Sequence, residues 1–266
     1  ETLAAATDAD LPDANQVSGG ISDTVTNGYI LGGYTGARSN KISKLVFATD
    51  TTSALTSTLS VIRGGGGSQG DTVAGYVSGG WSSGYIDFFD KFTYSSETSA
   101  ALTSVMDVGV SLPSGGSDGT TNGYQFGGHS PYTQHDEAFK LVYSTDVVSA
   151  ITDANLSQAR SQMTSVNSPL AVYVLSGFTG AKVVTADKMP FATEVTAAET
   201  SANLSQARAQ AFFGSLGDGI TGYVGGGIAV NDTIDGLTFA TDTTAAITET
   251  LSDERSGMAV ISDGNV

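Results

Sequence analysis

One short motif returns five times at nearly constant spacing, and this regularity constrains the fold more than any other feature of the chain. The motif is typified by GYILGGY at 28–34. Its tyrosines follow one another at intervals of 47, 48, 49 and 50 residues: Tyr29, Tyr76, Tyr124, Tyr173 and Tyr223. A second element, typified by KLVFATDT at 44–51, follows each motif, and a third, typified by SAITDANLSQAR at 149–160, comes next. A fixed period of this length is the signature of a repeat architecture.

Each repeat divides into four short segments rich in β-branched and aromatic residues. Gly, Asp, Asn and Ser separate them, which is typical of strands joined by turns. Four strands in each repeat of 47–50 residues correspond to one blade of a β-propeller. We therefore expect an all-β chain that forms a β-propeller of four-stranded blades, with five full repeats and a partial blade made from the two termini.

The strands are named a to d within a blade, and the predicted domain is a single propeller over 1–266. Its repeats begin near 17, 61, 108, 160 and 208. Residues 4–11 match a strand d, and residues 255–262 match a strand a. The termini would then form a sixth blade that lacks its middle strands. Either that blade is reduced, or the natural chain continues beyond Val266 and this sequence is excised from a longer one.

The chain resembles the kelch-repeat family in two features. A Gly-Gly pair follows an aromatic-bearing strand, and the next strand carries an aromatic-x-x-Asp pattern, as in Phe47-Ala-Thr-Asp50. The KLxFATDT strand is also similar to repeats of phage virion, tail-fibre and bacterial surface proteins. The kelch resemblance implies a propeller in which the b–c and d–a loops open on one face.

Charge and composition exclude several classes of partner. The net charge is −16, from 27 acidic and 11 basic residues. A nucleic-acid partner requires basic patches that replace phosphate counterions, and an anionic membrane surface would repel this chain. The chain has no cysteine and no apolar stretch approaching about 18 residues, which excludes thiolate chemistry and predicts no membrane insertion.

The residue after each Gly-Gly position defines a ring of equivalent candidates on the b–c face. Aromatic rings stack on sugars and grip partner side chains, so we predict a ligand-binding site here. Tyr85 is added because it shares the loop of Trp81. The predicted site residues are Tyr34, Trp81, Tyr85, His129 and Phe178. The alternative is that these rings only pack over their own blade edges.

The two histidines share one loop, where His129 and His135 stand near Asp136 and Glu137. A metal site is conceivable with these residue types. The spacing matches no standard zinc pattern, so we expect a polar exposed loop with no metal and no cofactor.

Two further sets of charged residues recur at equivalent positions. An arginine begins strand a in four repeats: Arg63, Arg160, Arg208 and Arg255. Such recurrence predicts a structural role, such as holding carbonyls or an acid of the neighbouring blade, and the alternative is a ring that grips an anionic sugar. An acid also recurs after the second element, and a turn-capping role is expected for it: Asp50, Glu97, Asp146, Glu194 and Asp242.

No Gly-x-Ser-x-Gly elbow or phosphate loop appears in a strand–helix setting, and the sequence contains no sialidase-type Asp box. The function expected is therefore a non-enzymatic binding or adhesion module, extracellular or on a virion surface, that recognises a glycan or protein receptor. One alternative is a structural component that contacts neighbouring subunits of an assembly, and a second is a carbohydrate-active enzyme. Fold alone does not choose among these functions.

Overall fold

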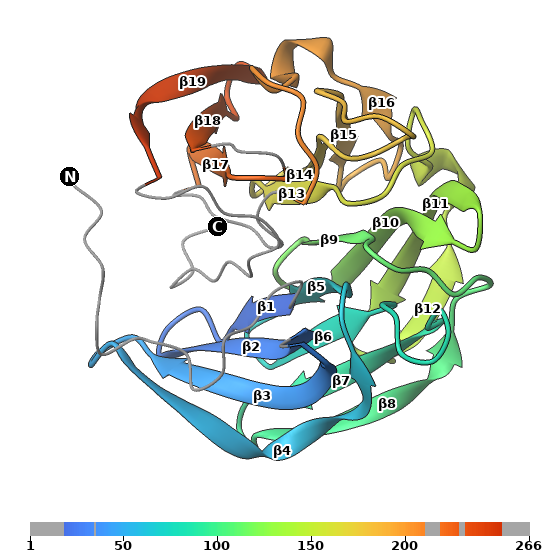
Figure 1. Cartoon of the computed structure of the whole chain (residues 1–266), viewed down its shortest axis with the longest axis vertical. Coiled ribbons are helices and arrows are strands. Elements are labelled where there is room, and N and C mark those ends of the chain that lie inside the picture. Colours follow the sequence, from blue (N-terminus) through green and yellow to red (C-terminus); the bar gives the residue numbers. More distant parts are fainter. Residues whose placement is uncertain (1–18, 35, 211–218, 229–231, 252–266) are drawn as a thin grey trace.

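Five antiparallel sheets stand around a common axis in the computed structural model, which describes residues 19–34, 36–210, 219–228 and 232–251 (Figure 1). Four sheets have four strands, and the fifth has three within these residues. The predicted all-β propeller is confirmed. The predicted terminal strands at 4–11 and 255–262 lie outside the described residues.

Strands a to d follow one another within each blade. The first blade comprises β1 (Gly19–Ser22), β2 (Asn27–Tyr34), β3 (Arg38–Val46) and β4 (Thr51–Arg63). The second comprises β5 (Gly67–Gly70), β6 (Ala74–Ser78), β7 (Phe88–Thr93) and β8 (Thr98–Val105). The third comprises β9 (Ser114–Ser117), β10 (Asn122–Ser130), β11 (Thr133–Val142) and β12 (Val147–Ala150). The fourth comprises β13 (Thr164–Asn167), β14 (Ala171–Leu175), β15 (Ala186–Pro190) and β16 (Ala197–Ala198). The fifth comprises strands b to d, which are β17 (Thr221–Gly225), β18 (Thr233–Thr238) and β19 (Thr243–Thr250), and the residues 211–218 that precede them lie outside the described residues.

The outer strands of the third and fourth blades are shorter than the repeat predicts. After β12 and β16 the chain enters the 3-10 turns η2 (Thr152–Ala154) and η3 (Thr200–Ala202). The Asn155 side chain then accepts a hydrogen bond from the Ala138 amide, and Asn203 accepts one from the Ala186 amide. These side chains replace the ladder bonds of a longer strand, which explains why strand d stops early.

The innermost strands of the first four blades, β1, β5, β9 and β13, pack side by side around the axis, and β17, which is strand b of the fifth blade, packs against β13. They are rich in glycine and serine because their backbones approach very closely. A Cβ placed on Gly115 of β9 would lie 2.2 Å from the backbone oxygen of Ser68 on β5. Neither backbone can move without displacing a whole blade, so this contact requires glycine.

We expect Gly115→Ala to lower the free energy of unfolding by about 1–3 kcal/mol, because the added methyl group overpacks a backbone contact. Gly84→Ala is the matched control, since no atom lies near its Cβ position and its φ is not positive. Urea unfolding of both variants measures the difference. Equal stability of the two variants would contradict this packing at the axis.

The recurring tyrosines join each blade to the next one. Each tyrosine ring stacks on an aromatic ring of the following blade, with centroids 5.2–5.7 Å apart. The pairs are Tyr29–Tyr94, Tyr76–Tyr143, Tyr124–Phe191 and Tyr173–Phe239. The hydroxyl donates to the recurring acid of that blade: Glu97, Asp146, Glu194 or Asp242. We call this arrangement the tyrosine latch.

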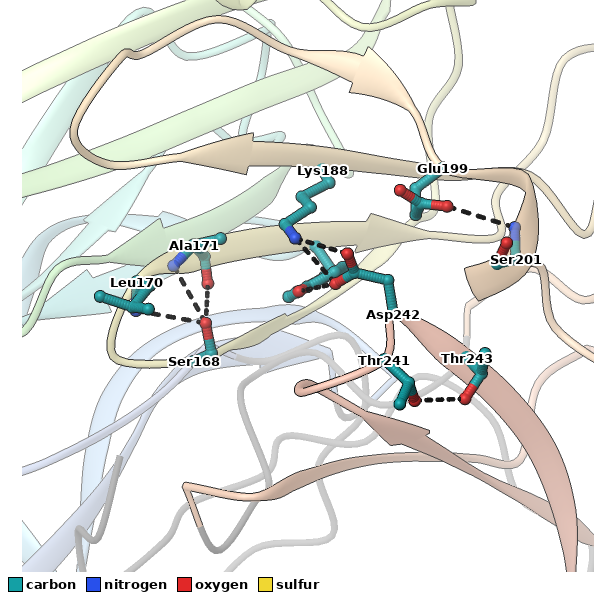
Figure 2. Close-up of polar contacts among 10 residues, drawn as sticks. Ser168, Leu170, Ala171, Lys188, Glu199, Ser201, Thr241, Asp242 and Thr243 are labelled. Atoms are coloured by element: carbon teal, nitrogen blue, oxygen red, sulfur yellow. Dashed lines mark hydrogen bonds and ion pairs between the residues drawn. The ribbon is translucent and has the colours of Figure 1, made fainter.

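A lysine completes each latch from the neighbouring strand. Its ammonium lies 2.6–2.9 Å from the same carboxylate in the pairs Lys44–Glu97, Lys91–Asp146, Lys140–Glu194 and Lys188–Asp242. Figure 2 shows Lys188 on β15 directed at Asp242 in the turn before β19. Four of the five acids therefore bind a neighbouring blade, so turn capping does not describe their main role. Burial, followed by the bond to Glu194, raises the pKa of Tyr124 far above its usual value and keeps it a donor.

Buried arginines form a second inter-blade contact, which confirms the structural role predicted for Arg63, Arg160 and Arg208. Each is at most 1% exposed. Each pairs with an aspartate on strand c of the next blade, and the N–O distances to Asp90, Asp187 and Asp235 are 2.5, 2.7 and 2.6 Å. A ring open to an anionic sugar is therefore wrong for these three. Arg255 lies outside the described residues.

One junction has lost both members of this ion pair together. Val110 occupies the position that holds arginine at the other described junctions. Its equivalence is shown by the backbone, because the Val110 carbonyl accepts a hydrogen bond from the Gly80 amide and the Arg160 carbonyl accepts one from the Gly128 amide. Phe139 stands where they have aspartate, and both replacements are buried. The paired exchange avoids a lone buried charge, which would be costly.

Candidate functional site

Backbone pairing places the residues after Gly-Gly on one face. Trp81 pairs with Gly64, His129 with Ser111 and Phe178 with Ser161, each partner lying in the connection that enters the same blade. Tyr34 instead ends β2, opposite Arg38 at the start of β3. Equivalent backbone contacts therefore hold these side chains near the central axis, on one face of the propeller.

An open pocket of about 340 Å³ occupies this face, within the lower range of small-ligand sites. Four of the five predicted residues line it, which shows that three successive blades bring their rings together. The lining is Tyr34, Arg38, Gly64, Gly65, Trp81, Tyr85, Ser111, Leu112, His129 and Gln210.

Three rings form a continuous wall of this pocket. The centroids of Trp81 and Tyr85 lie 4.5 Å apart at 79°, and those of Tyr85 and His129 lie 5.5 Å apart at 82°. Such edge-to-face contacts hold each ring by its neighbour. The guanidinium carbon of Arg38 lies 5.6 Å from the Trp81 ring centroid, a cation–π distance.

The inner side of the pocket comes from turns that encircle the axis. The amide of Leu112 donates to the carbonyl of Gly65, that of Gln162 to Leu112, and that of Gln210 to Gln162. All four residues have φ between 51° and 71°. This chain of turns fixes the backbone on the inner side of the site.

Phe178 is the predicted site residue that the pocket does not include. It occupies the equivalent position in the fourth blade, where it also pairs with Lys182. The sequence did not predict the other six lining residues, which are Arg38, Gly64, Gly65, Ser111, Leu112 and Gln210. Leu112 and Gln210 each stand two residues after the recurring Arg63-type position, which was an available signal. Arg38 is not repeated, so periodicity could not have found it.

The two histidines lie on the paired strands β10 and β11. The ring of His135 binds Ser130 Oγ at 2.7 Å and Glu137 Oε2 at 3.0 Å. His129 instead faces Tyr85 in the pocket. Within the described residues, no three His, Asp or Glu side chains are grouped so that they could hold a metal ion.

Burial lowers the pKa of His129 below its usual value of about 6.5. Below pH 6.5 the unfolded chain takes up this proton before the folded chain does, so stability falls as the pH drops. We expect an NMR titration of the His129 ring to give a midpoint below 6.5, and His129→Gln to remove this part of the acid sensitivity. A midpoint at or above 6.5 would contradict a half-buried, neutral imidazole.

No protein-family model matches the chain, and no curated protein matches it either. Within the described residues, no helix is long and apolar enough to cross a membrane.

Proposed function

We propose that this propeller is a non-enzymatic binding module, displayed on a virion fibre or cell surface, that recognises a glycan through the pocket at the axis. The observation that carries this proposal is the convergence of Tyr34, Trp81, Tyr85 and His129 on one hollow. Sugar rings present C–H faces that pack on aromatic rings and hydroxyl groups that exchange hydrogen bonds with nearby polar groups.

The pocket offers both kinds of contact. Trp81 and Tyr34 are partly exposed, so their ring surfaces are accessible. Ser111, Gln210 and the Tyr85 hydroxyl add polar groups to the lining. A rigid aromatic contact loses little side-chain entropy on binding, which suits recognition of a flexible saccharide.

The charge of the lining narrows the class of glycan. Arg38 is the one charged side chain in the lining, in a chain of net charge −16. It makes no ion pair with any described residue. A saccharide with an anionic group beside its stacked ring fits this arrangement best.

A glycan array probed with the intact chain, presented as a multivalent complex, tests the proposal. Multivalent presentation is needed because single sites of this kind bind weakly. Binding to a defined group of glycans, with anionic members preferred, is the expected result. If the chain binds no glycan on the array at micromolar concentration, the proposal is contradicted.

A structural component of an assembly is the second candidate. The observation that favours it is an incomplete latch on the first blade, where Phe47 and Asp50 have no aromatic or cationic partner among the described residues. A chain that binds no glycan but assembles through this blade would support that function.

A further inference from the structure

The first blade carries one half of a tyrosine latch. Phe47 and Asp50 occupy the positions that Tyr94 and Glu97 hold in the second blade, and Asp50 has φ 52° where Glu97 has 51°. In the part of the chain that the structure describes, no ring packs on Phe47, and neither a lysine nor a tyrosine hydroxyl binds Asp50. Asp50 is exposed to solvent.

The fifth blade carries the complementary half. Tyr223 is partly exposed, whereas the four latched tyrosines are each 1% exposed. Gly236 stands opposite Tyr223, where the other blades place the latch lysine.

The sequence itself limits what can complete the latch on Asp50. Every tyrosine and every lysine of the chain lies among the described residues, because residues 1–18, 35, 211–218, 229–231 and 252–266 contain neither. Four tyrosines and four lysines already serve the other latches. The remaining strand b tyrosine, Tyr223, faces Gly236 instead of a lysine, so the described strands contain no fifth cross-strand tyrosine–lysine pair, and such a pair for Asp50 would be supplied by another polypeptide segment.

We propose that the surface formed by Phe47 and Asp50 binds a β-hairpin of this same repeat type, presented by a segment other than residues 1–266. The tyrosine of that hairpin stacks on Phe47, and its hydroxyl and the cross-strand lysine bind the Asp50 carboxylate. The far turn of the hairpin offers an aromatic ring and an acid to Tyr223. Charge complementarity and the fourfold repetition of this contact within the chain both specify this partner.

The test supplies such a hairpin by fusion. A copy of residues 123–147, which carries Tyr124, Lys140, Tyr143 and Asp146, is appended after Val266. The matched control appends the same copy with Tyr124→Phe and Lys140→Gln, so both chains have equal length. We expect the melting temperature of the first to exceed that of the control by about 2–4 °C, the effect of one modest contact in a chain of this size.

Asp50→Asn then identifies the binding surface. Asparagine tolerates positive φ as aspartate does, so this change removes charge without strain. It should leave the unfused chain unchanged and should abolish the gain of the fused one. Equal melting temperatures of the two fused chains, or a gain that survives Asp50→Asn, would overturn the proposal. Neither result bears on the pocket.

Discussion

Asp187→Ala is expected to lower the free energy of unfolding by about 3–5 kcal/mol, because it leaves the charge of Arg160 buried without its partner. Both side chains are fully buried, and Arg160 Nη1 lies 2.7 Å from Asp187 Oδ2. The second amino group of Arg160 binds the Val174 carbonyl at 3.0 Å, which cannot neutralise a charge. Urea unfolding followed by circular dichroism measures the loss.

The chain supplies its own control for this prediction. Arg160→Val combined with Asp187→Phe copies the apolar pair Val110 and Phe139, so the double variant should recover most of the loss. Lys44→Gln breaks an ion pair whose side chains are 22% and 36% exposed, and should cost about 1 kcal/mol or less. A loss for Asp187→Ala no larger than that of Lys44→Gln would show that the buried pair does not hold the blades together.

Trp81→Ala is expected to weaken glycan binding by about 30-fold, which corresponds to about 2 kcal/mol for a central aromatic contact. The substitution removes the largest ring of the pocket wall and the surface beneath Arg38. The fold should survive, because Trp81 pairs with Gly64 through backbone atoms that alanine retains. Calorimetric titration with a glycan found on the array gives both affinities.

Phe178→Ala is the control for this substitution. It removes an aromatic ring from the equivalent position of the fourth blade, outside the pocket. Its affinity should stay within about twofold of the parent chain. If Phe178→Ala weakens binding as much as Trp81→Ala does, the ligand contacts the whole ring of equivalent positions rather than the pocket.

The blades could be predicted from the sequence because their strands repeat with the same turns. The period of Tyr29, Tyr76 and Tyr124 specifies strand b, and the aromatic-x-x-Asp pattern specifies strand c. The joint loss of Arg63-type and Asp90-type residues at Val110 and Phe139 was also present in the sequence. This joint replacement could have identified the buried ion pairs. A residue that is replaced in the same repeat as the arginine is expected to be in contact with it.

The extent of the pocket could not be predicted in the same way. Periodicity treats Phe178 and Trp81 as equivalent, whereas the pocket depends on which neighbours each ring meets in space. Tyr85 closes the gap between Trp81 and His129, and the fourth blade has Lys182 in the corresponding pairing with Phe178. Arg38 comes from a hairpin that differs from the others, so its place above Trp81 is a property of the folded chain.

Intrinsic tryptophan fluorescence offers the most direct measurement of the central claim, that the pocket at the axis is the glycan site. Trp81 is the one tryptophan of the chain and forms part of the pocket wall. Titration with a glycan that binds should change its emission, and the half-maximal change should fall at the concentration at which calorimetry shows half-occupancy. Glycan binding that leaves the emission of Trp81 unchanged would place the site elsewhere on the propeller.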